Sequence, residues 1–458
     1  TKYVRDAARD SYKRLIAPSI ATEIRGLLTE AAEESSIKVF NQNLSGLLLQ
    51  PPISGKVVMG FDPGYRTGCK VAVVDETGKV LDTNVVYCTL PIHDKAKAQK
   101  ILTDMIEKNR VELISIGNGT ASKESEIFIS DLLKTLDREV FYIMTNEAGA
   151  SVYSAAKLAT EEFPQYDVAL RSAVSIARRA QDPLAELVKI DPKSIGVGQY
   201  QHDMNQKRLG EALEGVVEAC VNSVGVDLNT ASPSLLSYVA GINKTVSKNI
   251  TAYREENGKF TSRKELLKVP KLGAKAFEQC AGFMRITDGA NPLDNTSVHP
   301  ESYKAATELL KLLGYTADDV KNGAVADLKS RLAEKGAGAL AKTLGIGEIT
   351  LTDIADSIIK KGRDPREELP QPVLRSDILS MEDLKPDTVL TGTVRNVIDF
   401  GAFVDIGVHQ SGLVHVSQIS DRRITSPREA VKLHQHVRVK VLDVDLKRNR
   451  ISLSMKGL

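Results

Sequence analysis

The chain has 458 residues, more than one hydrophobic core commonly spans, so we expect roughly three or four domains. Hydrophobic residues make up 42% and charged residues 26%, which is ordinary for a globular protein, and no apolar run approaches the roughly 18 residues that a membrane helix needs. The formal net charge of +2 does not mark a nucleic-acid binder, and the four scattered cysteines form no C-x-x-C pair, so neither a zinc site nor a disulfide framework is indicated.

Residues 1–52 are predicted to be a helical segment. Apolar residues recur with helical spacing directly after Thr1, which takes the place of an initiator methionine, so we expect the chain to be a fragment of a longer protein. Pro51 and Pro52 end the helical pattern.

Residues 53–190 are predicted to form a mixed sheet covered by helices. Short apolar runs bounded by turn residues predict strands at 57–61, 71–75, 80–87, 111–116 and 140–144. Helical patterns separate and follow the last two strands, near 94–108, 122–136 and up to residue 189. Three strands followed by alternating helices and strands are typical of an α/β domain.

Residues 203–286 are predicted to be helical and contain an internal repeat at an offset of 30 residues. The positions Leu236, Ile242, Asn243, Val246, Ile250 and Tyr253 correspond to Leu266, Leu272, Gly273, Ala276, Cys280 and Phe283. Each copy predicts a helix, a tight hairpin and a second helix, and such hairpins turn backbone N–H groups toward a phosphate. The pattern resembles a tandem helix-hairpin-helix unit, which implies contact with the DNA backbone through Gly241, Asn243, Lys244, Lys271, Gly273 and Lys275.

Neither hairpin has the full glycine pattern of that motif, because Asn243 and Lys271 each take the place of a glycine. The alternative is a helical scaffold that only packs neighbouring domains. Residues 287–362 are predicted to form a further helical domain, in which Gly345-Ile346-Gly347 is a weak candidate for a third hairpin. The Pro-rich, charged stretch 363–384 predicts a semi-extended linker.

Residues 385–458 are predicted to form a small all-β domain. The stretch carries 12 lysines and arginines against 7 acidic residues, a local net charge of +5, and four of the seven histidines. Strands with period-two alternation are expected at 389–398, 401–406, 412–415, 437–445 and 450–454. Five short strands in about 70 residues match a closed barrel of the oligonucleotide-binding (OB) type.

The candidate RNA-binding residues of this barrel are two aromatic rings, a histidine and an arginine. Phe400 and Phe403 flank a Gly-Ala turn, His415 lies on the next strand, and Arg450 follows the last hairpin turn. Bases stack on flat rings while cations meet phosphates, so this set suits single-stranded RNA. The alternative is that both phenylalanines belong to the barrel core.

The motifs that contain these residues resemble the RNA-binding domain named after ribosomal protein S-one, over about 70 residues. They read Gly392-Thr393-Val394, Phe400-Gly401-Ala402-Phe403-Val404-Asp405, Gly412-Leu413-Val414-His415 and Arg450-Ile451-Ser452-Leu453-Ser454. The resemblance implies an RNA face at Phe400, Phe403, His415 and Arg450, with Asp445 in support. One residue is inserted between Asp445 and Arg450, so Arg448 and Arg450 are both candidates for the phosphate contact.

The mixed-sheet domain resembles the ribonuclease-H-like fold and, within it, the YqgF branch related to Holliday-junction resolvases. Members that cut nucleic acid gather three or four carboxylates around Mg²⁺. Asp62 matches the first acid, Glu124 or Glu126 is a candidate for the second, and Glu147 follows the next strand. The last acid is expected in the helix 169–180, which has none; Asp167 just precedes it and is the remaining candidate.

Arg171 stands near the place of that missing acid. We expect it either to repel a metal ion or to form an ion pair with Asp62 or Glu147. The domain is therefore expected not to be catalytic, no cofactor is expected, and Mg²⁺ would be needed only if the domain is a nuclease.

The order of domains resembles the bacterial Tex family of transcription accessory proteins over essentially the whole chain. The motifs that carry this resemblance include Phe61-Asp62-Pro63-Gly64-Tyr65-Arg66, Gly117-Asn118-Gly119-Thr120, Glu147-Ala148-Gly149-Ala150 and Gly196-Val197-Gly198-Gln199-Tyr200. It implies a fold of a ribonuclease-H-like α/β domain, a helical helix-hairpin-helix region and a C-terminal five-stranded OB-type barrel. It further implies a cytoplasmic nucleic-acid-binding scaffold acting in transcription, with RNA and also DNA as partners. The alternatives are a metal-dependent nuclease and a protein-interaction platform on RNA polymerase or the ribosome.

Overall fold

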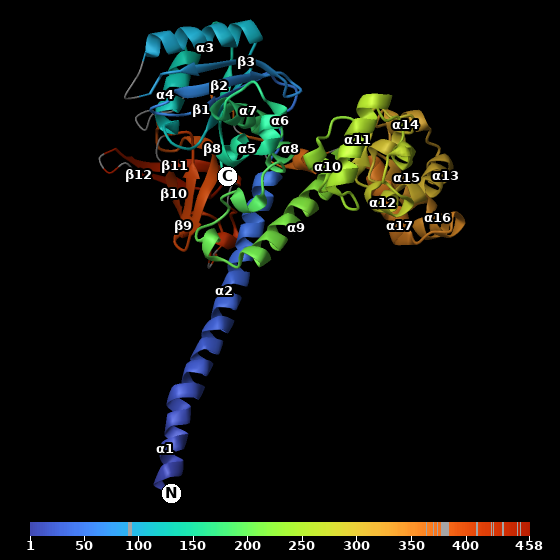
Figure 1. Cartoon of the computed structure of the whole chain (residues 1–458). Helices are drawn as coiled ribbons and strands as arrows, with labels where there is room; N and C mark the ends of the chain where they lie inside the picture. The colour runs from blue at the N-terminus through green and yellow to red at the C-terminus, as the bar shows by residue number, and fades with distance from the viewer. Residues whose placement is uncertain are drawn as a thin grey trace.

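The computed structural model describes residues 1–89, 94–362, 364–369, 371–372, 374–376, 384–408, 411–422, 424, 426–432, 435–446, 448 and 450–458. A long N-terminal helix projects from the body of the molecule, which consists of a mixed-sheet domain, a barrel beside it and a helical lobe on the other side (Figure 1). Among the described residues, no helix has both the length and the apolar composition to cross a membrane.

The N-terminal helix is almost continuous, with α1 at Lys2–Ser11, a π-helical turn at Tyr12–Ile16 and α2 at Ala17–Leu48. Pro18 cannot donate a backbone hydrogen bond, and a widened turn before a proline is a common accommodation. The helix is largely exposed until Ile37, after which its apolar side packs on α9 (Gln206–Val224). It ends before Pro51, as predicted.

The mixed sheet has the strand order β3-β2-β1-β4-β5. Its strands are β1 Val58–Asp62, β2 Cys69–Val74, β3 Val80–Val86, β4 Leu113–Gly117 and β5 Phe141–Thr145, which confirms the five predicted strands. β1 runs antiparallel to β2 and parallel to β4, and β4 runs parallel to β5. The carboxyl ends of β1, β4 and β5 therefore meet at one edge of the sheet.

Helices cover both faces of this sheet. The helices of the domain are α3 Lys95–Asn109, α4 Ser122–Leu133, α5 Ala150–Ala155, α6 Lys157–Glu162, α7 Val168–Gln181 and α8 Pro183–Leu187. One apolar core lies under α3 and α4, and a second lies under α7. Gly60 is required for the second, because a Cβ atom there would lie 2.1 Å from the carbonyl oxygen of Ala173 on α7. All four cysteines are buried and unbridged, as expected.

The helical lobe begins after α9 and contains two hairpins and a separate helical domain. Its elements are β6 Val226–Asp227, α10 Pro233–Leu236, α11 Lys244–Asn257, α12 Ala274–Cys280, β7 Met284–Arg285, α13 Tyr303–Leu313, α14 Ala317–Lys321, α15 Leu328–Lys335, α16 Ala337–Leu344 and α17 Glu348–Ile359. The second copy of the repeat opens with a 3₁₀ helix, Arg263–Lys268, instead of an α-helix. Helices α13 to α17 enclose an apolar core of their own.

The C-terminal domain is a closed barrel in the order β10-β12-β11-β8-β9. Its strands are β8 Val389–Ile398, β9 Gly401–Asp405, β10 Gly412–His415, β11 His436–Asp445 and β12 Arg450–Ser454. They match the predicted strands to within one residue at each end, and their inward residues form one core. The five-stranded barrel of the OB type is thus confirmed.

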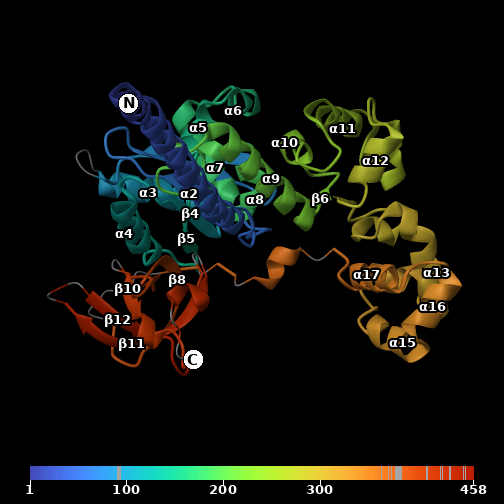
Figure 2. The same ribbon diagram turned by 90° about the horizontal axis from the view of Figure 1, so that it is seen from below.

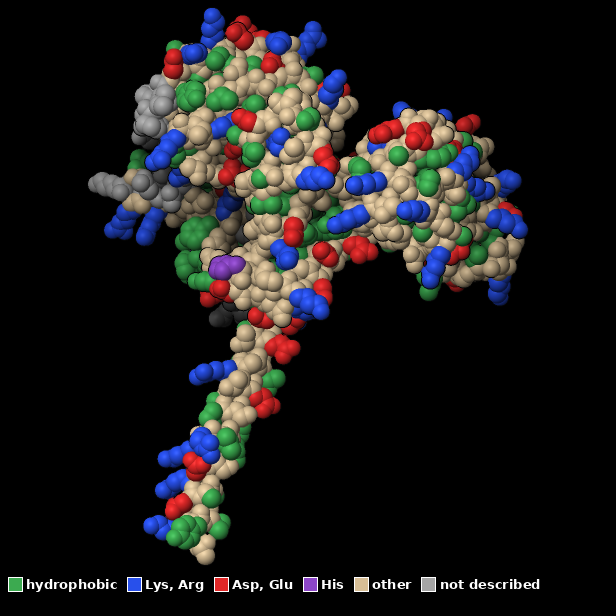
Figure 3. Space-filling view, in the orientation of Figure 1, with side chains coloured by type: hydrophobic (Ala, Val, Ile, Leu, Met, Phe, Trp, Pro, Cys, Tyr) green, Lys and Arg blue, Asp and Glu red, His purple; other side chains and the backbone are tan. Residues whose placement is uncertain are grey.

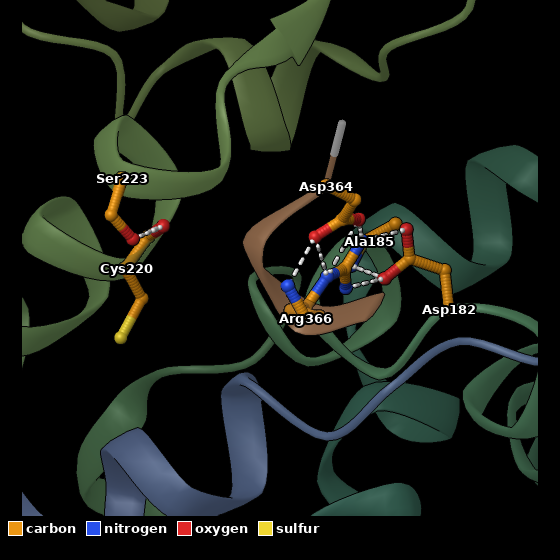
Figure 4. A network of polar contacts seen from close by, with 6 residues as sticks. All are labelled: Asp182, Ala185, Cys220, Ser223, Asp364 and Arg366. Carbon is orange, nitrogen blue, oxygen red and sulfur yellow. Dashed lines mark hydrogen bonds and ion pairs between the residues drawn. The ribbon is translucent and has the colours of Figure 1, made fainter. Parts of the chain in front are cut away.

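The described part of the predicted linker lies along the mixed-sheet domain, on the way from α17 to the barrel (Figure 2). Arg366, in a 3₁₀ helix at Pro365–Glu368, is buried and donates to both Asp182 and Asp364 at 2.7–3.2 Å (Figure 4). Asp182 also caps α8 by accepting from the N–H of Ala185. The segment is therefore fastened to the domain and does not act as a free spacer, and we call its described residues 364–376 the strap.

Candidate nucleic-acid interface

The barrel places the predicted RNA-binding residues on its outer surface. On β9, Ala402 and Val404 point into the core, so Phe403 between them points outward. Phe403 lies opposite Leu413 on β10, and Leu413 lies opposite Ser452 on β12. Neither Phe400 nor Phe403 belongs to the core of the barrel, and the Phe400 side chain is 53% exposed. The alternative of two core phenylalanines is therefore wrong.

Phe400 and His415 are held next to each other by the backbone. The N–H of Val416 donates to the carbonyl oxygen of Phe400 at 2.8 Å. Gly401 lies opposite His415, and a Cβ atom at Gly401 would lie 2.3 Å from the carbonyl oxygen of Val414, so only glycine permits this approach. The Nδ1 atom of His415 accepts from the Ser417 N–H at 3.3 Å, and His415 is exposed.

The two candidate arginines occupy different places at the end of the β11–β12 hairpin. Arg450 begins β12 opposite Asp445, and because Ile451 and Leu453 point into the core, Arg450 points outward with Ser452. Arg448 lies in the turn, where its backbone N–H donates to Asp445 at 3.1 Å and its guanidinium lies 3.9 Å from the same carboxylate. The geometry favours Arg450 as the cation that shares a surface with Phe403, and we call Phe400, Phe403, His415 and Arg450 the barrel face.

One edge of the barrel face meets the mixed-sheet domain through an ion-pair chain. Asp405, the next outward residue of β9 after Phe403, lies 3.1 Å from Arg375 of the strap and 2.9 Å from Arg395. Arg375 also lies 3.2 Å from Glu126 on α4. Burial works against ionisation, but Arg375 and Arg395 keep the pKa of Asp405 below its usual range.

This contact changes the interpretation of Glu126, which the sequence offered as a candidate catalytic acid. Its carboxylate is engaged by Arg375 and by the hydroxyl of Tyr142 at 3.1 Å, away from Asp62. The backbone of Arg375 also pairs with Tyr142 of β5 in a short antiparallel bridge. Sequence reasoning missed Arg375, because a cation in a Pro-rich stretch gives no local sign of its partners.

Two of the predicted acids do meet at the sheet edge. Asp62 ends β1, and Glu147 follows β5 with its carboxylate over Gly117 and Gly119, where a Cβ atom would collide with it. Burial raises the pKa of Asp62 to about 6; a hydrogen bond with Ser172 opposes this rise, and the charge of Glu147 adds to it.

The other predicted acids and Arg171 are used elsewhere. Glu124 accepts from the Tyr65 hydroxyl at 3.0 Å, and Asp167 caps α7 by accepting from the Leu170 N–H at 2.8 Å. Arg171 is buried and donates to Thr160 and to the carbonyl oxygens of Phe163 and Ser154, so the expected ion pair with Asp62 or Glu147 is wrong. Within the described residues, no three Asp, Glu, His or Cys side chains are placed to hold a metal ion, so these residues do not fit the Mg²⁺ site of a nuclease.

The raised pKa of Asp62 predicts a stabilising substitution. The pKa of Asp62 is about 6 in the folded chain and about 3.9 in the unfolded chain, so the protonated carboxyl group favours the folded state. This contribution to the free energy of unfolding is fully present below about pH 3.9 and is lost as the pH rises through about 6. Asp62→Asn should therefore raise the free energy of unfolding by on the order of 2 kcal/mol near pH 8 and change it little near pH 4. Urea unfolding across this pH range measures the difference. Asp167→Asn, an exposed helix cap, is the control and should show no such gain.

The two hairpins of the repeat differ at their second helices. Gly241 (φ +80°) and Lys271 (φ +66°) both adopt the left-handed conformation that the turn needs. Asn243 caps α11, its side chain accepting from two backbone N–H groups at 2.9–3.0 Å, whereas Gly273 leaves the first N–H groups of α12 without a side-chain cap. The second hairpin is thus the more open to an external oxygen acceptor.

Lysines surround both hairpins. Lys244, Lys271 and Lys275 are exposed, and Figure 3 shows separate lysine and arginine side chains on the visible face of the helical lobe, with acidic side chains among them. The Asn249 side chain donates to the carbonyl oxygen of Pro270 at 2.8 Å and ties the two hairpins together. The sequence motif 345–347 has the same form, with Gly345 at φ +67° between α16 and α17.

Comparisons with known proteins agree with this arrangement. Family models match four parts of the chain: the Tex protein YqgF-like domain at 56–181, a helix-hairpin-helix motif at 221–285, an HHH domain at 291–366 and the S1 RNA binding domain at 383–456. The HHH domain match includes the weak third hairpin, which the sequence alone left undecided.

Three relatives are similar over nearly all of this chain. They are the uncharacterized protein YdcI of Bacillus subtilis (54% identical, 99% of this chain and 62% of that protein), the transcriptional accessory protein Tex of Neisseria gonorrhoeae (49%, 99% and 59%) and protein YhgF of Escherichia coli (50%, 95% and 56%). The chain spans about three fifths of the length of these relatives.

Proposed function

We propose that this chain, which belongs to the Tex family, is a cytoplasmic nucleic-acid-binding scaffold that holds single-stranded RNA on its barrel and the backbone of DNA on its hairpins. The observation that carries the proposal is the barrel face, where two aromatic rings, an imidazole and a guanidinium from separate positions share one outer surface. The rings offer stacking surfaces for bases and Arg450 offers a cation for phosphate.

The hairpins support a second, sequence-independent contact. The backbone N–H groups at the start of α12 have no side-chain cap, and Lys271 and Lys275 lie beside them, which suits a phosphate oxygen. Such contacts read no bases. We propose that Gly273 lies at the centre of this contact, with Gly241, Asn243 and Lys244 in a lesser role because the Asn243 side chain already occupies two N–H groups of α11.

A role in transcription follows from the name of the gonococcal relative, and RNA polymerase is the protein partner we propose, with the ribosome as the alternative. A protein-interaction platform would keep its partner after nucleic acid is removed. Capture of the partner from extract before and after nuclease treatment therefore distinguishes the two: a scaffold that reaches the machinery through RNA should lose it.

Substitutions in the barrel face should weaken RNA binding without unfolding the barrel. Phe400→Ala or Phe403→Ala should weaken binding of single-stranded RNA by ~1–3 kcal/mol, or about 5–150-fold, because each removes one stacking surface. Titration with labelled RNA measures the affinity, and a thermal melt of each variant serves as the control. Unchanged affinity with a large drop in melting temperature would show that these rings stabilise the barrel and do not bind RNA.

A nuclease is the second candidate, because Asp62 and Glu147 meet at the sheet edge where such domains bind metal. We expect no cleavage of single-stranded RNA, single-stranded DNA, duplex DNA or a four-way junction with Mg²⁺ or Mn²⁺. Two-metal hydrolysis needs several carboxylates around cations ~4 Å apart, and Glu126 and Asp167 are engaged elsewhere. Cleavage by the natural chain that disappears in Asp62→Asn would make the domain an enzyme.

A further inference from the structure

A cavity of about 340 Å³ lies where the end of α2, strand β5, the strap and the barrel meet. Its size is near the lower end of the ~300–1,000 Å³ range of small-molecule sites, so it has room for one small ligand. None of the barrel-face residues lines it. The cavity is therefore a separate feature of the molecule and does not depend on RNA binding at the barrel face.

The two sides of the cavity differ in chemistry. The side made by the end of α2, β5 and the strap is mostly apolar, including Pro51, Met144 and Leu369, and its polar members are Gln50 and the ion-paired Arg375. Cations and polar groups form the side made by the barrel, including Arg395, Lys432 and His436. No acidic residue is among the described residues that line it. An anion with an apolar body matches this division.

Two of the three cations that line the cavity are paired with carboxylates, and the third is available to a ligand. Asp405 and Glu126 offset the charges of Arg375 and Arg395, both of which line the cavity. Lys432 is exposed and makes no ion pair with any other residue that the structure describes. Its ammonium group is therefore available for an anionic group that enters the cavity.

A flat ring lies next to these cations. The imidazole of His436 is half-buried, and its Nδ1 lies 3.0 Å from the Thr393 hydroxyl, its partner across β8 and β11. Gln50 and Gln435 line the same cavity, and their side-chain amides can both donate and accept, as the edge of a base requires. Aromatic rings, including histidine, are the common stacking surfaces for bases.

We propose that this cavity binds a single nucleotide, with its phosphate at Lys432 and its base between His436 and the apolar wall at Met144. The same chemistry has two sources, a free mononucleotide or the phosphorylated end of an RNA strand. Arg395 lines the cavity and pairs with Asp405, which lies on β9 two residues after Phe403 of the barrel face. The end of an RNA strand bound at the barrel face is therefore close to the cavity.

The helix α2 provides a variant that fills the cavity without disturbing the fold. Gly46 lines the cavity, and a Cβ atom there would meet nothing within 4 Å. Gly46→Leu should block the ligand while raising helix propensity. Gly26→Leu is its matched control, because Gly26 lies in the same helix, is equally open and does not line the cavity. Lys432→Glu tests the phosphate contact, with Lys385→Glu as the same change elsewhere on the barrel.

The experiment is calorimetric titration of the full chain with AMP, GMP, CMP and UMP, with the matching nucleosides and with inorganic phosphate. At least one mononucleotide should bind, and its nucleoside and free phosphate should bind at least tenfold more weakly. Gly46→Leu and Lys432→Glu should each weaken mononucleotide binding at least tenfold, while the two control variants, Gly26→Leu and Lys385→Glu, leave it unchanged.

RNA oligomers with and without a terminal phosphate identify the source. A terminal phosphate that tightens binding in the natural chain and not in Gly46→Leu assigns the cavity to the end of a strand; mononucleotide binding without that effect assigns it to free nucleotide. No binding of any mononucleotide together with no effect of the terminal phosphate overturns the proposal. Equal binding of inorganic phosphate, or full affinity in Gly46→Leu, overturns it as well.

Discussion

A chain without residues 385–458 should lose most of its affinity for single-stranded RNA. Two stacking surfaces at ~1–3 kcal/mol each, together with the cation at Arg450, amount to a loss on the order of a thousandfold. Filter binding or fluorescence titration measures it. The undeleted chain with Phe400→Ala, Phe403→Ala and Arg450→Ala is the control, because it lacks the same contacts and keeps the barrel. If the shortened chain binds RNA as tightly as the intact one, the barrel face is not the RNA-binding site.

The shortened chain should still bind duplex DNA weakly and with strong salt dependence through the hairpins. Each phosphate contact contributes about 0.9 to the slope of log affinity against log salt. Gly273→Glu should weaken this binding, because a carboxylate would face the phosphate while the fold has room for the side chain. Gly215→Glu, an equally open and exposed position on α9, is the matched control. Duplex binding that survives Gly273→Glu would exclude this hairpin from the contact.

The elements that the sequence predicted best are those whose pattern is local. In the barrel, Ile451 and Leu453 alternate with Arg450 and Ser452, and this period of two defines both the strand and its outward face. The repeat at 30 residues likewise predicted both hairpins, since each places a buried Ile242 or Leu272 between two turn residues. Such signals lie within a few neighbouring residues and need no knowledge of the tertiary structure.

The predictions that the structure changed depended on the direction in which a single side chain points. Asp167 was a candidate metal ligand, although an acid directly before a helical pattern is also a common cap, and the structure uses it as one. The sequence predicted that Arg171 takes the place of the last metal-binding acid and lies near Asp62. In the structure, Arg171 donates to the carbonyl oxygen of Phe163, and the next residue, Ser172, makes the hydrogen bond with Asp62. A rotation of one residue along a helix, about 100°, decides which of the two faces the sheet edge.

Glu126 was misinterpreted for a different reason. Its partner Arg375 is 249 positions away in the sequence, in a stretch whose composition indicates only an extended chain. Ion pairs between domains follow from how the domains dock, and no periodicity encodes that. The same holds for Arg366 and Asp182, which are 184 positions apart.

Arg375→Glu should release the barrel from the mixed-sheet domain, because Arg375 joins carboxylates from both. The side chains of Arg375, Glu126 and Asp405 are only 17%, 13% and 15% exposed, so solvent and salt screen them little. Removing one partner from a buried pair costs about 3–5 kcal/mol, chiefly because the remaining charges stay buried without compensation. A glutamate at this position would add repulsion from both carboxylates.

The expected result is a separation of the two domains with each one still folded. The Tyr142 N–H donates to the carbonyl oxygen of Arg375 at 2.7 Å, so its hydrogen exchange reports on the contact directly. A change of 3 kcal/mol or more corresponds to an exchange rate about a hundredfold faster, and small-angle scattering should show a larger radius of gyration.

Arg395→Glu is the matched control, because Arg395 pairs with the same Asp405 but both residues belong to the barrel. It should leave the Tyr142 exchange rate and the radius of gyration close to those of the natural chain. A double variant with Arg375→Glu and Glu126→Arg should restore part of the contact by reversing one ion pair. If Arg375→Glu leaves both measurements unchanged, the domains are held by other contacts and the ion-pair chain adds nothing to their docking.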